Sequence, residues 1–361
     1  MFYLWLKTML PENPAVARIT TQAGLAALSA FAFSLVFGRL LIRLFRRRGV
    51  IEDVAKPDSA TLDRLHSVKR GTPTMGGLMI LAATLASTLL WANVRDGLVL
   101  LGLGTLLGLG ALGFADDYLK LTRRPRRGLR ARTKLAGQLM VGLVVGVLLW
   151  RGTHTAPADG HVLSSLVEGG VRLGPWFAVL AALAIAIMSN GVNLTDGVDG
   201  LAGGCVALAM LALAALAGVM CHAALSVTLG LGHMPEARGL AVLCAAVGGA
   251  TLGFLWYNGH PAQIFMGDTG SLALGGLLGF VAVALRQEML VLLLGCVFVV
   301  ELLSVVLQVA CFKATGRRLF RCSPIHHHFE FAGWPETKVT VRFWIVMVVA
   351  LVCTVALFRV S

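Results

Sequence analysis

The sequence predicts an all-α polytopic membrane protein with about ten transmembrane helices. Of its 361 residues, 57% are hydrophobic and 14% are charged, and the mean hydropathy of +0.81 exceeds what the core of a water-soluble protein of this length requires. The apolar residues also form runs long enough to cross about 30 Å of hydrocarbon, which takes roughly 17 to 25 helical residues. These runs lie at 19–42, 72–91, 97–115, 133–151, 174–190, 201–221, 238–256, 270–285, 289–311 and 341–359.

The basic residues predict the orientation, because Lys and Arg concentrate in cytoplasmic loops. Three alternate segments, 43–71, 116–134 and 312–342, hold 22 of the 31 Lys and Arg residues. We therefore expect these segments to face the cytoplasm and both termini to be extracytoplasmic. Since no cleavable signal peptide is recognisable, the first span is expected to act as the insertion signal. The whole chain, 1–361, is expected to form a single integral membrane domain.

The net charge of +13 follows largely from this topology, but a second interpretation remains. The segment 123–132 carries six arginines, which could attract anionic membrane lipid or a phosphorylated substrate. Nucleic acid is a poor alternative, because this segment has no interleaved aromatic residues and no binding-module pattern. The seven cysteines lie mostly within spans and include no Cys-x-x-Cys pair, so we interpret them as buried apolar residues rather than disulfides or a zinc site.

Asp116 and Asp117 end the third expected span. A carboxylate near membrane depth costs about 2.5 kcal/mol or more, and the helix dipole disfavours negative charge at this end. The two acids could simply be solvated and paired with Lys120 and the nearby arginines. Alternatively, adjacent acids beside a basic entrance could bind a cation or accept a proton from a substrate phosphate.

Two further segments on the predicted cytoplasmic side contain no Lys or Arg. Residues 190–200 supply two acids and two amides among glycines, which suit a hard cation, a sugar or a base, although a turn capped by Asp is the simpler alternative. Residues 256–271 end in Gly-Asp-Thr-Gly-Ser, where the N-terminus of the next helix favours an anion such as phosphate. Asp268 could cap that helix or hold Mg²⁺, and Tyr257 and Phe265 offer aromatic faces to a nucleobase.

Other polar groups cluster on the same predicted side. Glu301, Ser304 and Gln308 share one face of the ninth span, as a structural network or a site wall. Residues 69–77 form an irregular, basic entry to the second span, and residues 323–331 contain three consecutive histidines. Together with the carboxylates, these groups predict a cytoplasmic cleft for phosphoryl-type transfer, since such catalysis consists mainly of positioning and charge neutralisation.

These motifs resemble the polyprenyl-phosphate N-acetylhexosamine-1-phosphate transferases, specifically the branch that uses phospho-N-acetylmuramoyl-pentapeptide. The resemblance covers 69–77, 116–118, 190–200, 258–271, 301–308 and 324–330, and the segment Pro-Ile-His-His-His-Phe-Glu is its most specific part.

The resemblance implies transfer of phospho-MurNAc-pentapeptide from UDP-MurNAc-pentapeptide to undecaprenyl phosphate, giving lipid I and UMP. It further implies a Mg²⁺ cofactor, a homodimer, and a location in the bacterial cytoplasmic (inner) membrane with the active site facing the cytoplasm. Among the catalytic residues it implies, Asp268 would bind Mg²⁺, joined in one alternative by Asp116 and Asp117, which would lie near the lipid phosphate. The nucleotide and sugar pocket would consist of Asn190, Asn193, Asp196, Asn258 and Phe265, while Lys69, Thr74, Gln308, a catalytic His326, His327 and His328 would contact phosphates or substrate.

Two other functions fit some of the same features. A sister transferase that moves GlcNAc-1-phosphate would have the same polar clusters and a different sugar-binding segment. A transporter would place its charged groups near the membrane midplane, but the span centres here are almost free of ionisable residues apart from Glu301. For the transferase, we expect direct attack by the lipid phosphate with Asp116 as base, and the rival is a covalent phospho-sugar on one Asp.

Overall fold

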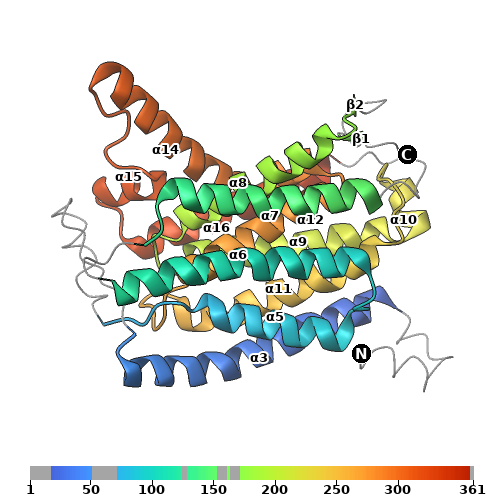
Figure 1. Ribbon diagram of the computed structural model, residues 1–361, viewed down its shortest axis with the longest axis horizontal. Coiled ribbons are helices and arrows are strands. Elements are labelled where there is room, and N and C mark those ends of the chain that lie inside the picture. The colour runs from blue at the N-terminus through green and yellow to red at the C-terminus, as the bar shows by residue number, and fades with distance from the viewer. Residues whose placement is uncertain (1–17, 51–70, 124–127, 153–160, 163–170, 358–361) are drawn as a thin grey trace.

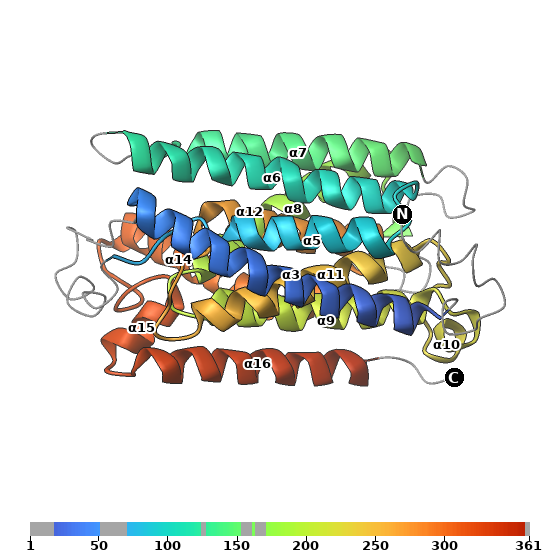
Figure 2. The same ribbon diagram turned by 90° about the horizontal axis from the view of Figure 1, so that it is seen from below.

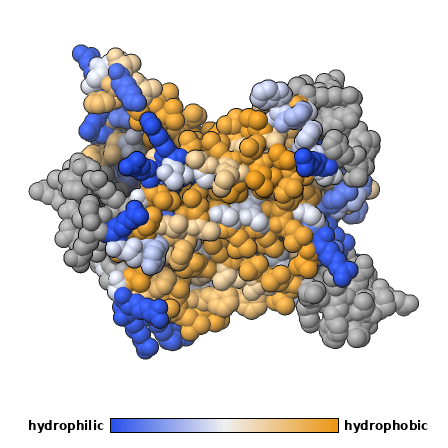
Figure 3. Space-filling view, in the orientation of Figure 1, coloured by the Kyte–Doolittle hydropathy of each residue, from blue (hydrophilic) through white to orange (hydrophobic). Residues whose placement is uncertain are grey.

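The computed structural model describes residues 18–50, 71–123, 128–152, 161–162 and 171–357. Within these residues the protein is a helical bundle in which most of the long helices run roughly along one direction, while α14 is oblique to them (Figure 1). Apolar side chains form a broad band around the middle of the bundle, and hydrophilic residues gather at its two ends (Figure 3). This distribution is that of a protein that spans a bilayer, so the predicted class is confirmed.

Nine helices of the described residues are long and apolar enough to cross a membrane, and one shorter apolar helix, α5 (Gly77–Trp91), occupies the tenth expected position. The prediction of about ten spans is therefore confirmed. The nine are α3 (Ile19–Arg48), α6 (Gly97–Thr122), α7 (Ala131–Gly152), α8 (Trp176–Thr195), α9 (Leu201–Met220), α11 (Ala237–Asn258), α12 (Gly267–Ala284), α14 (Cys296–Thr315) and α16 (Glu336–Ala356).

Two boundaries differ from the prediction in ways that affect the site. The expected span 289–311 is wrong as one continuous helix, because it is divided into α13 (Glu288–Leu294) and α14 around Gly295. Glycine is a poor helix former, and Gly295 has non-helical φ −106° and ψ 19°. Helix α8 also continues to Thr195, five residues beyond the predicted end at 190.

The remaining elements are α10 (Ala223–Thr228), α15 (Ile325–Phe331) and the antiparallel strands β1 (His161–Val162) and β2 (Val171–Arg172), which pair His161 with Arg172 and Val162 with Val171.

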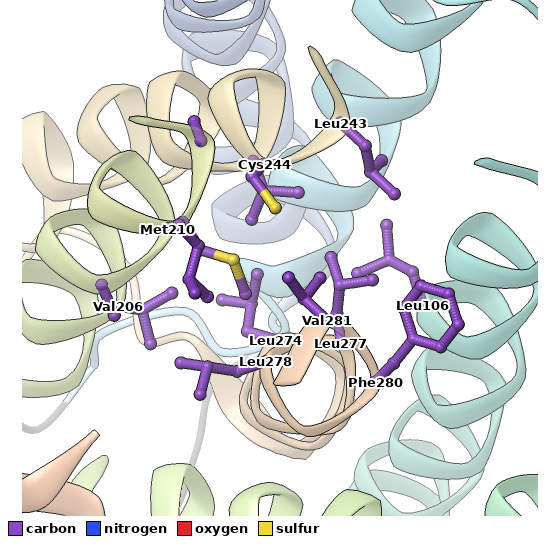
Figure 4. Packing of buried hydrophobic residues seen from close by; sticks show 14 of the residues in the cluster. Leu106, Val206, Met210, Leu243, Cys244, Leu274, Leu277, Leu278, Phe280 and Val281 are labelled. Atoms are coloured by element: carbon purple, nitrogen blue, oxygen red, sulfur yellow. The ribbon is translucent and has the colours of Figure 1, made fainter. Parts of the chain in front are cut away.

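Helix α12 is the centre of the bundle. Every residue from Asp268 to Ala284 is buried, and α12 packs mainly against α6 and α8 (Figure 2). Its apolar side chains meet those of α6, α9 and α11 in a continuous core (Figure 4). Around α12, Figure 4 labels Leu106, Val206, Met210, Leu243, Cys244, Leu274, Leu277, Leu278, Phe280 and Val281.

Two glycines let neighbouring helices approach the first turn of α12. A Cβ at Gly113 of α6 would collide with the backbone oxygen of Asp268, and one at Gly77 of α5 would collide with the backbone of Gly270. Without these side chains, the backbones of α5, α6 and α12 touch. The end of α6 and the start of α12 are thereby brought together, and the acidic residues lie at this junction.

Candidate active site

The predicted polar clusters, where the structure describes them, gather at one end of the bundle. There α6 ends, α12 begins and the short helix α15 lies, at the left of Figure 1. The α3 helix begins and the α16 helix ends at the other end of the bundle. Lys69 lies outside the described residues.

Three carboxylates form an acidic cluster, which we define as Asp116 and Asp117 of α6 and Asp268 of α12. One oxygen from each lies within 4.8 Å of the others, and all three residues are buried. The interpretation of Asp116 and Asp117 as solvated acids is therefore wrong. Hard carboxylate oxygens at this spacing are the donor set that Mg²⁺ prefers, so the residues fit the ion that the sequence implies.

Two lysines neutralise much of this charge. Lys120 Nζ lies 2.7 Å from Asp116 Oδ2 and 3.4 Å from Asp268 Oδ2. Lys134 Nζ lies 2.7 Å from Asp268 Oδ2 and 3.5 Å from Asp116 Oδ2. Lys120 follows Asp116 by one helical turn, so the sequence indicated that pairing. Lys134 starts the next helix and was not predicted, because a basic residue in an arginine-rich segment carries no signal of its own.

Asp117 has a different role from its neighbour. Its carboxylate accepts hydrogen bonds from the backbone N–H groups of Asp268 and Thr269, at 3.1 and 2.9 Å, and from the Thr269 hydroxyl at 2.7 Å. Asp117 therefore caps the N-terminus of α12 from a different helix. The sequence predicted an anion at this helix N-terminus, and the anion there is the carboxylate of Asp117. Gly267 makes the contact possible, since it has φ +73° and a Cβ there would lie 2.6 Å from Asp117 Oδ2.

Helix α8 supplies amides to the same junction. Asn193 Nδ2 donates to Asp268 Oδ1 at 2.9 Å and to Ser271 Oγ at 2.8 Å. One turn earlier, Asn190 Nδ2 donates to Gln138 Oε1 at 2.7 Å, and Gln138 in turn donates to Ser189. Asn190 and Asn193 therefore lie on the helix rather than in the predicted loop. Gln138 was missed, since nothing in an apolar α7 distinguishes a functional amide from a packing one.

The next segment after α8 turns into α9. Asp196 is the half-buried C-cap residue of α8, and Gly200 precedes α9 with φ +75°. Asn258 binds this turn, because its side chain accepts a hydrogen bond from Gly200 N at 3.0 Å and donates to Ile264 O at 2.9 Å. Asn258 thus connects the turn before α9 with the segment before α12.

The residues that lead into α5 lie beside the segment that precedes α12. Phe265 N donates to Pro73 O, and Gly76 N donates to Phe265 O. Thr74 is buried between these contacts and Phe265 is half-buried. Tyr257, which was predicted to offer a face to a nucleobase, donates its hydroxyl to Leu35 O of α3, so its ring packs on α3 instead.

The triple-histidine segment is helix α15 rather than a loop. His326 and His327 are buried, and each faces a carboxylate through Nδ1: His326 lies 3.1 Å from Glu301 Oε1, and His327 contacts Glu330 at 2.5 Å. His328 Nδ1 accepts a hydrogen bond from Arg321 N at 3.2 Å. Gln308 binds the backbone of Leu319 and Phe320 and so fixes the turn that leads to this helix.

A second group of potential ligands, the His260 cluster, consists of Asp199, His260 and Glu336. His260 Nδ1 lies 3.1 Å from Asp199 Oδ2 and 3.6 Å from Glu336 Oε2. Glu336 also accepts from Asp199 N at 2.6 Å. This cluster joins the starts of α9 and α16 to the segment after α11, and the sequence did not predict it because its members are far apart in the chain.

An apolar groove lies between α14, α15 and α16. It has a volume of about 330 Å³ and is formed by side chains of α14, α15 and α16 together with Trp334. At its edge the Arg342 guanidinium lies 4.0 Å from the centre of the Trp334 ring. The lining residues are Cys296, Val297, Val300, Ile325, Phe329, Trp334, Arg342, Phe343 and Val346.

Two comparisons with known protein families match the chain. Residues 98–286, more than half of its length, match the model of the family described as Glycosyl transferase family 4. Residues 69–81 match Phospho-N-acetylmuramoyl-pentapeptide-transferase signature 1. The first match contains the complete acidic cluster and Asn193, and the second contains Lys69, Thr74 and the first turn of α5.

Proposed function

The chain belongs to glycosyl transferase family 4 and carries the signature of the phospho-N-acetylmuramoyl-pentapeptide transferases. On this basis we propose which residues bind the metal, the substrates and the transferred phosphoryl group. The protein transfers phospho-MurNAc-pentapeptide from its UDP carrier to undecaprenyl phosphate in peptidoglycan synthesis. The single observation that carries our assignment of the site is the acidic cluster, with its two lysines, inside the family match.

Mg²⁺ is the proposed cofactor, with Asp268 and Asp116 as its carboxylate ligands. When bound, the ion would neutralise the diphosphate of the nucleotide sugar. In each of these carboxylates, one oxygen lies next to a lysine ammonium group. The ammonium groups can move away and leave these oxygens to the ion. Asp117 is the less suitable ligand, because both of its oxygens accept hydrogen bonds from the first turn of α12. We therefore assign Asp117 to the alignment of Asp268.

The proposed reaction is a direct displacement. An oxygen of undecaprenyl phosphate attacks the β-phosphorus of the UDP-sugar, the bond from that phosphorus to the bridging oxygen breaks, and UMP leaves. Lys120 and Lys134 would stabilise the charge that develops on the phosphoryl oxygens. A phosphate monoester is largely ionised at neutral pH and needs little help from a base, so the base role expected for Asp116 is secondary to its proposed role as a Mg²⁺ ligand. A phospho-sugar trapped on an Asp in the absence of lipid would contradict this direct route.

The amides and the aromatic residue near the junction are proposed to form the nucleotide and sugar pocket. Phe265 is suited to stack on the uracil, since its ring is only half-buried. Asn258 and Gln308 would shape the pocket through the backbone segments that they bind. The remaining proposed contacts to sugar or phosphate are Lys69, Thr74, Asn190, Asn193, Asp196, His326, His327 and His328.

The apolar groove beside α15 is the proposed seat for the first isoprene units of the lipid acceptor. Its lining is apolar, its outer helices α14 and α16 present many exposed apolar side chains, and Arg342 is at its edge. Replacing Val300 with Trp would fill the groove. We expect it to raise KM for undecaprenyl phosphate at least tenfold and to leave KM for the nucleotide sugar within about twofold.

The orientation and assembly are also proposals. The site end of the bundle contains the basic last turn of α3 and the Lys120 and Lys134 pair, which supports a cytoplasmic active site and extracytoplasmic termini. Labelling of single cysteines in intact cells would test this. Family membership leads us to propose a homodimer in the membrane, which cross-linking before detergent extraction would detect.

The test of function is UMP release by the detergent-purified protein with undecaprenyl phosphate and Mg²⁺. We expect release with UDP-MurNAc-pentapeptide and none above background with UDP-GlcNAc. Asp268→Asn serves as the inactive control and must retain the elution volume of the folded protein. Release with UDP-GlcNAc alone would move the chain to the sister transferases.

A further inference from the structure

Glu301 is a carboxylate in the interior of the bundle that the proposed mechanism does not use. It lies in the second turn of α14 and is 0% exposed. Burial of an ionised carboxylate is costly unless an opposite charge or a proton donor compensates it. The structure offers one such group, His326 of α15, whose side chain is also 0% exposed.

The side chains of Glu301 and His326 face each other at ion-pair distance and have no hydrogen-bond partner among the described residues. Glu301 Oε1 lies 3.1 Å from His326 Nδ1, which is an ion-pair distance without the angle of a hydrogen bond. Neither carboxylate oxygen and neither ring nitrogen has a hydrogen-bond partner among the described residues. The nearby titratable groups are the His327 ring, with its centroid at 4.1 Å from that of His326, and the Cys205 thiol of α9.

Burial determines how many protons this pair holds. A buried pair is stable when its net charge is zero, which requires one proton in addition to the N–H of neutral imidazole. The extra proton can stay on His326 Nδ1 facing an ionised Glu301, or on Glu301 facing a neutral imidazole. In both arrangements Nε2 of His326 keeps its hydrogen.

The Nε2 atom faces the turn that follows α8. A Cβ built on Gly197 would lie 2.5 Å from His326 Nε2 and 3.4 Å from His327 Nε2. Glycine at this position therefore lets the turn pack directly against the two imidazoles, and the buried Nε2 of His326 has no hydrogen-bond partner there among the described residues. Because Gly197 directly follows Asp196, a donor at Nε2 points to the segment proposed to bind the nucleotide sugar.

We propose that Glu301 is a positioning residue for the transferase: its carboxylate holds His326 at Nδ1, so that Nε2 keeps its hydrogen. When the turn at Gly197 shifts on substrate binding, Nε2 donates this hydrogen to an oxygen of the substrate. This inference rests on the proposed function for the identity of that oxygen. The pairing itself and the protonation of Nε2 do not depend on it.

Glu301→Gln keeps the size of the side chain and removes the negative charge. The variant no longer needs the extra proton, and the Gln amide can either accept a hydrogen bond from Nδ1 or donate one to it, so the hydrogen on Nε2 is no longer fixed. We expect kcat to fall about 30-fold with less than a threefold change in KM for either substrate, as for other residues that orient a functional histidine. Glu301→Asp should recover part of the loss.

A double-mutant cycle separates positioning from general structure. If Glu301 acts through His326, then His326→Gln alone and Glu301→Gln combined with His326→Gln should have the same kcat within about twofold. Ser304→Ala is the matched control, because Ser304 is one turn further along α14, is buried and donates to the backbone oxygen of Glu301. It should retain wild-type kcat. Additive losses in the cycle would overturn the proposal.

A spectroscopic measurement tests the pairing independently of turnover. In full-length protein with ¹⁵N-labelled histidine, the signal of His326 is identified among the nine histidines by its loss in His326→Gln. Nε2 should be fully protonated in the wild type and in Ser304→Ala, and only partly protonated in Glu301→Gln, where both neutral tautomers are accessible. An unprotonated Nε2 in the wild type would overturn the inference even if the enzyme is active. A protonated Nε2 in a protein without UMP release would instead leave the pairing intact and contradict the proposed function.

Discussion

The acidic cluster and the His260 cluster each bring three potential metal ligands within 4.8 Å, yet they satisfy their charges differently. In the acidic cluster, Asp117 and Asp116 Oδ1 accept from backbone N–H groups, whereas Asp116 Oδ2 and Asp268 Oδ2 face lysine ammonium groups at the ends of long side chains. In the His260 cluster, the compensation is fixed: the Asp199 carboxylate accepts from His260 and from Ala262 N, and Glu336 accepts from Asp199 N.

This difference shows why proximity of ligands does not identify a metal site. A lysine ammonium group can move aside when a divalent cation binds, since its four-carbon chain reaches into solvent-accessible space. A backbone N–H group cannot move without breaking the local fold. We therefore expect the acidic cluster to bind Mg²⁺ and the His260 cluster to act as a structural connection between α9, α16 and the segment after α11.

The largest expected effect is that of Asp268→Asn. The change removes a proposed Mg²⁺ ligand and the partner of Lys134, and we expect the rate of UMP release to fall by about 10³-fold or more. The measurement is initial rate at saturating Mg²⁺ and both substrates. Because Asn can still accept the hydrogen bond from Asn193, the fold should persist, and the elution volume and Tm check it. A variant with more than a tenth of wild-type activity would exclude Asp268 from the metal site.

Removal of the metal tests whether the acidic cluster, rather than the His260 cluster, binds Mg²⁺. We expect excess EDTA to abolish UMP release and Mg²⁺ to restore it. Mg²⁺ should also raise the Tm of the wild type, because a ligand that binds the folded state stabilises it.

The matched variants for this metal test come from the two clusters. The Tm increase should be absent in Asp268→Asn and should persist in His260→Gln. The opposite pattern would assign the ion to the His260 cluster.

Lys134→Met should have a smaller effect with two opposing parts. The loss of an ammonium group near the phosphoryl oxygens should lower kcat by about tenfold to a hundredfold. The same change removes the cation that competes with Mg²⁺ for Asp268, so half-saturation should need about tenfold less Mg²⁺. A titration of rate against Mg²⁺ gives both quantities. A higher Mg²⁺ requirement would show that Lys134 does not compete with the ion.

The sequence predicted the class of fold because apolar run length is a local property. It located nine spans and α5, but it did not predict the break at Gly295, since apolar residues continue on both sides of it. The acids of the site could be identified because a carboxylate at a span end is costly and needs a reason. The function of Asp117 as a cap of α12 could not be predicted, because it depends on contact between residues 151 positions apart.

The contacts of the histidine segment likewise could not be predicted from the sequence. Its three imidazoles led us to predict a functional segment; the structure places the segment at the site end, and the function and the roles of its residues stay predictions. His326 faces Glu301, which the sequence left open as a structural group or a site wall, whereas His327 faces Glu330 and His328 accepts from Arg321 N. The contact with Glu301 joins α14 to α15, and no spacing within either helix indicates it.

His260→Gln should have the smallest effect of these changes. His260 is 42% exposed, so solvent weakens its ion pairs with Asp199 and Glu336, and we expect a loss of about 1 kcal/mol in stability. For a protein of this size that corresponds to a drop in Tm of about 2 °C. UMP release at saturating substrates should stay within threefold of the wild type, because the cluster connects helices and is not proposed to touch substrate. A loss of activity as large as that of Lys134→Met, at unchanged Tm, would instead place His260 in the reaction and remove the distinction between the two clusters.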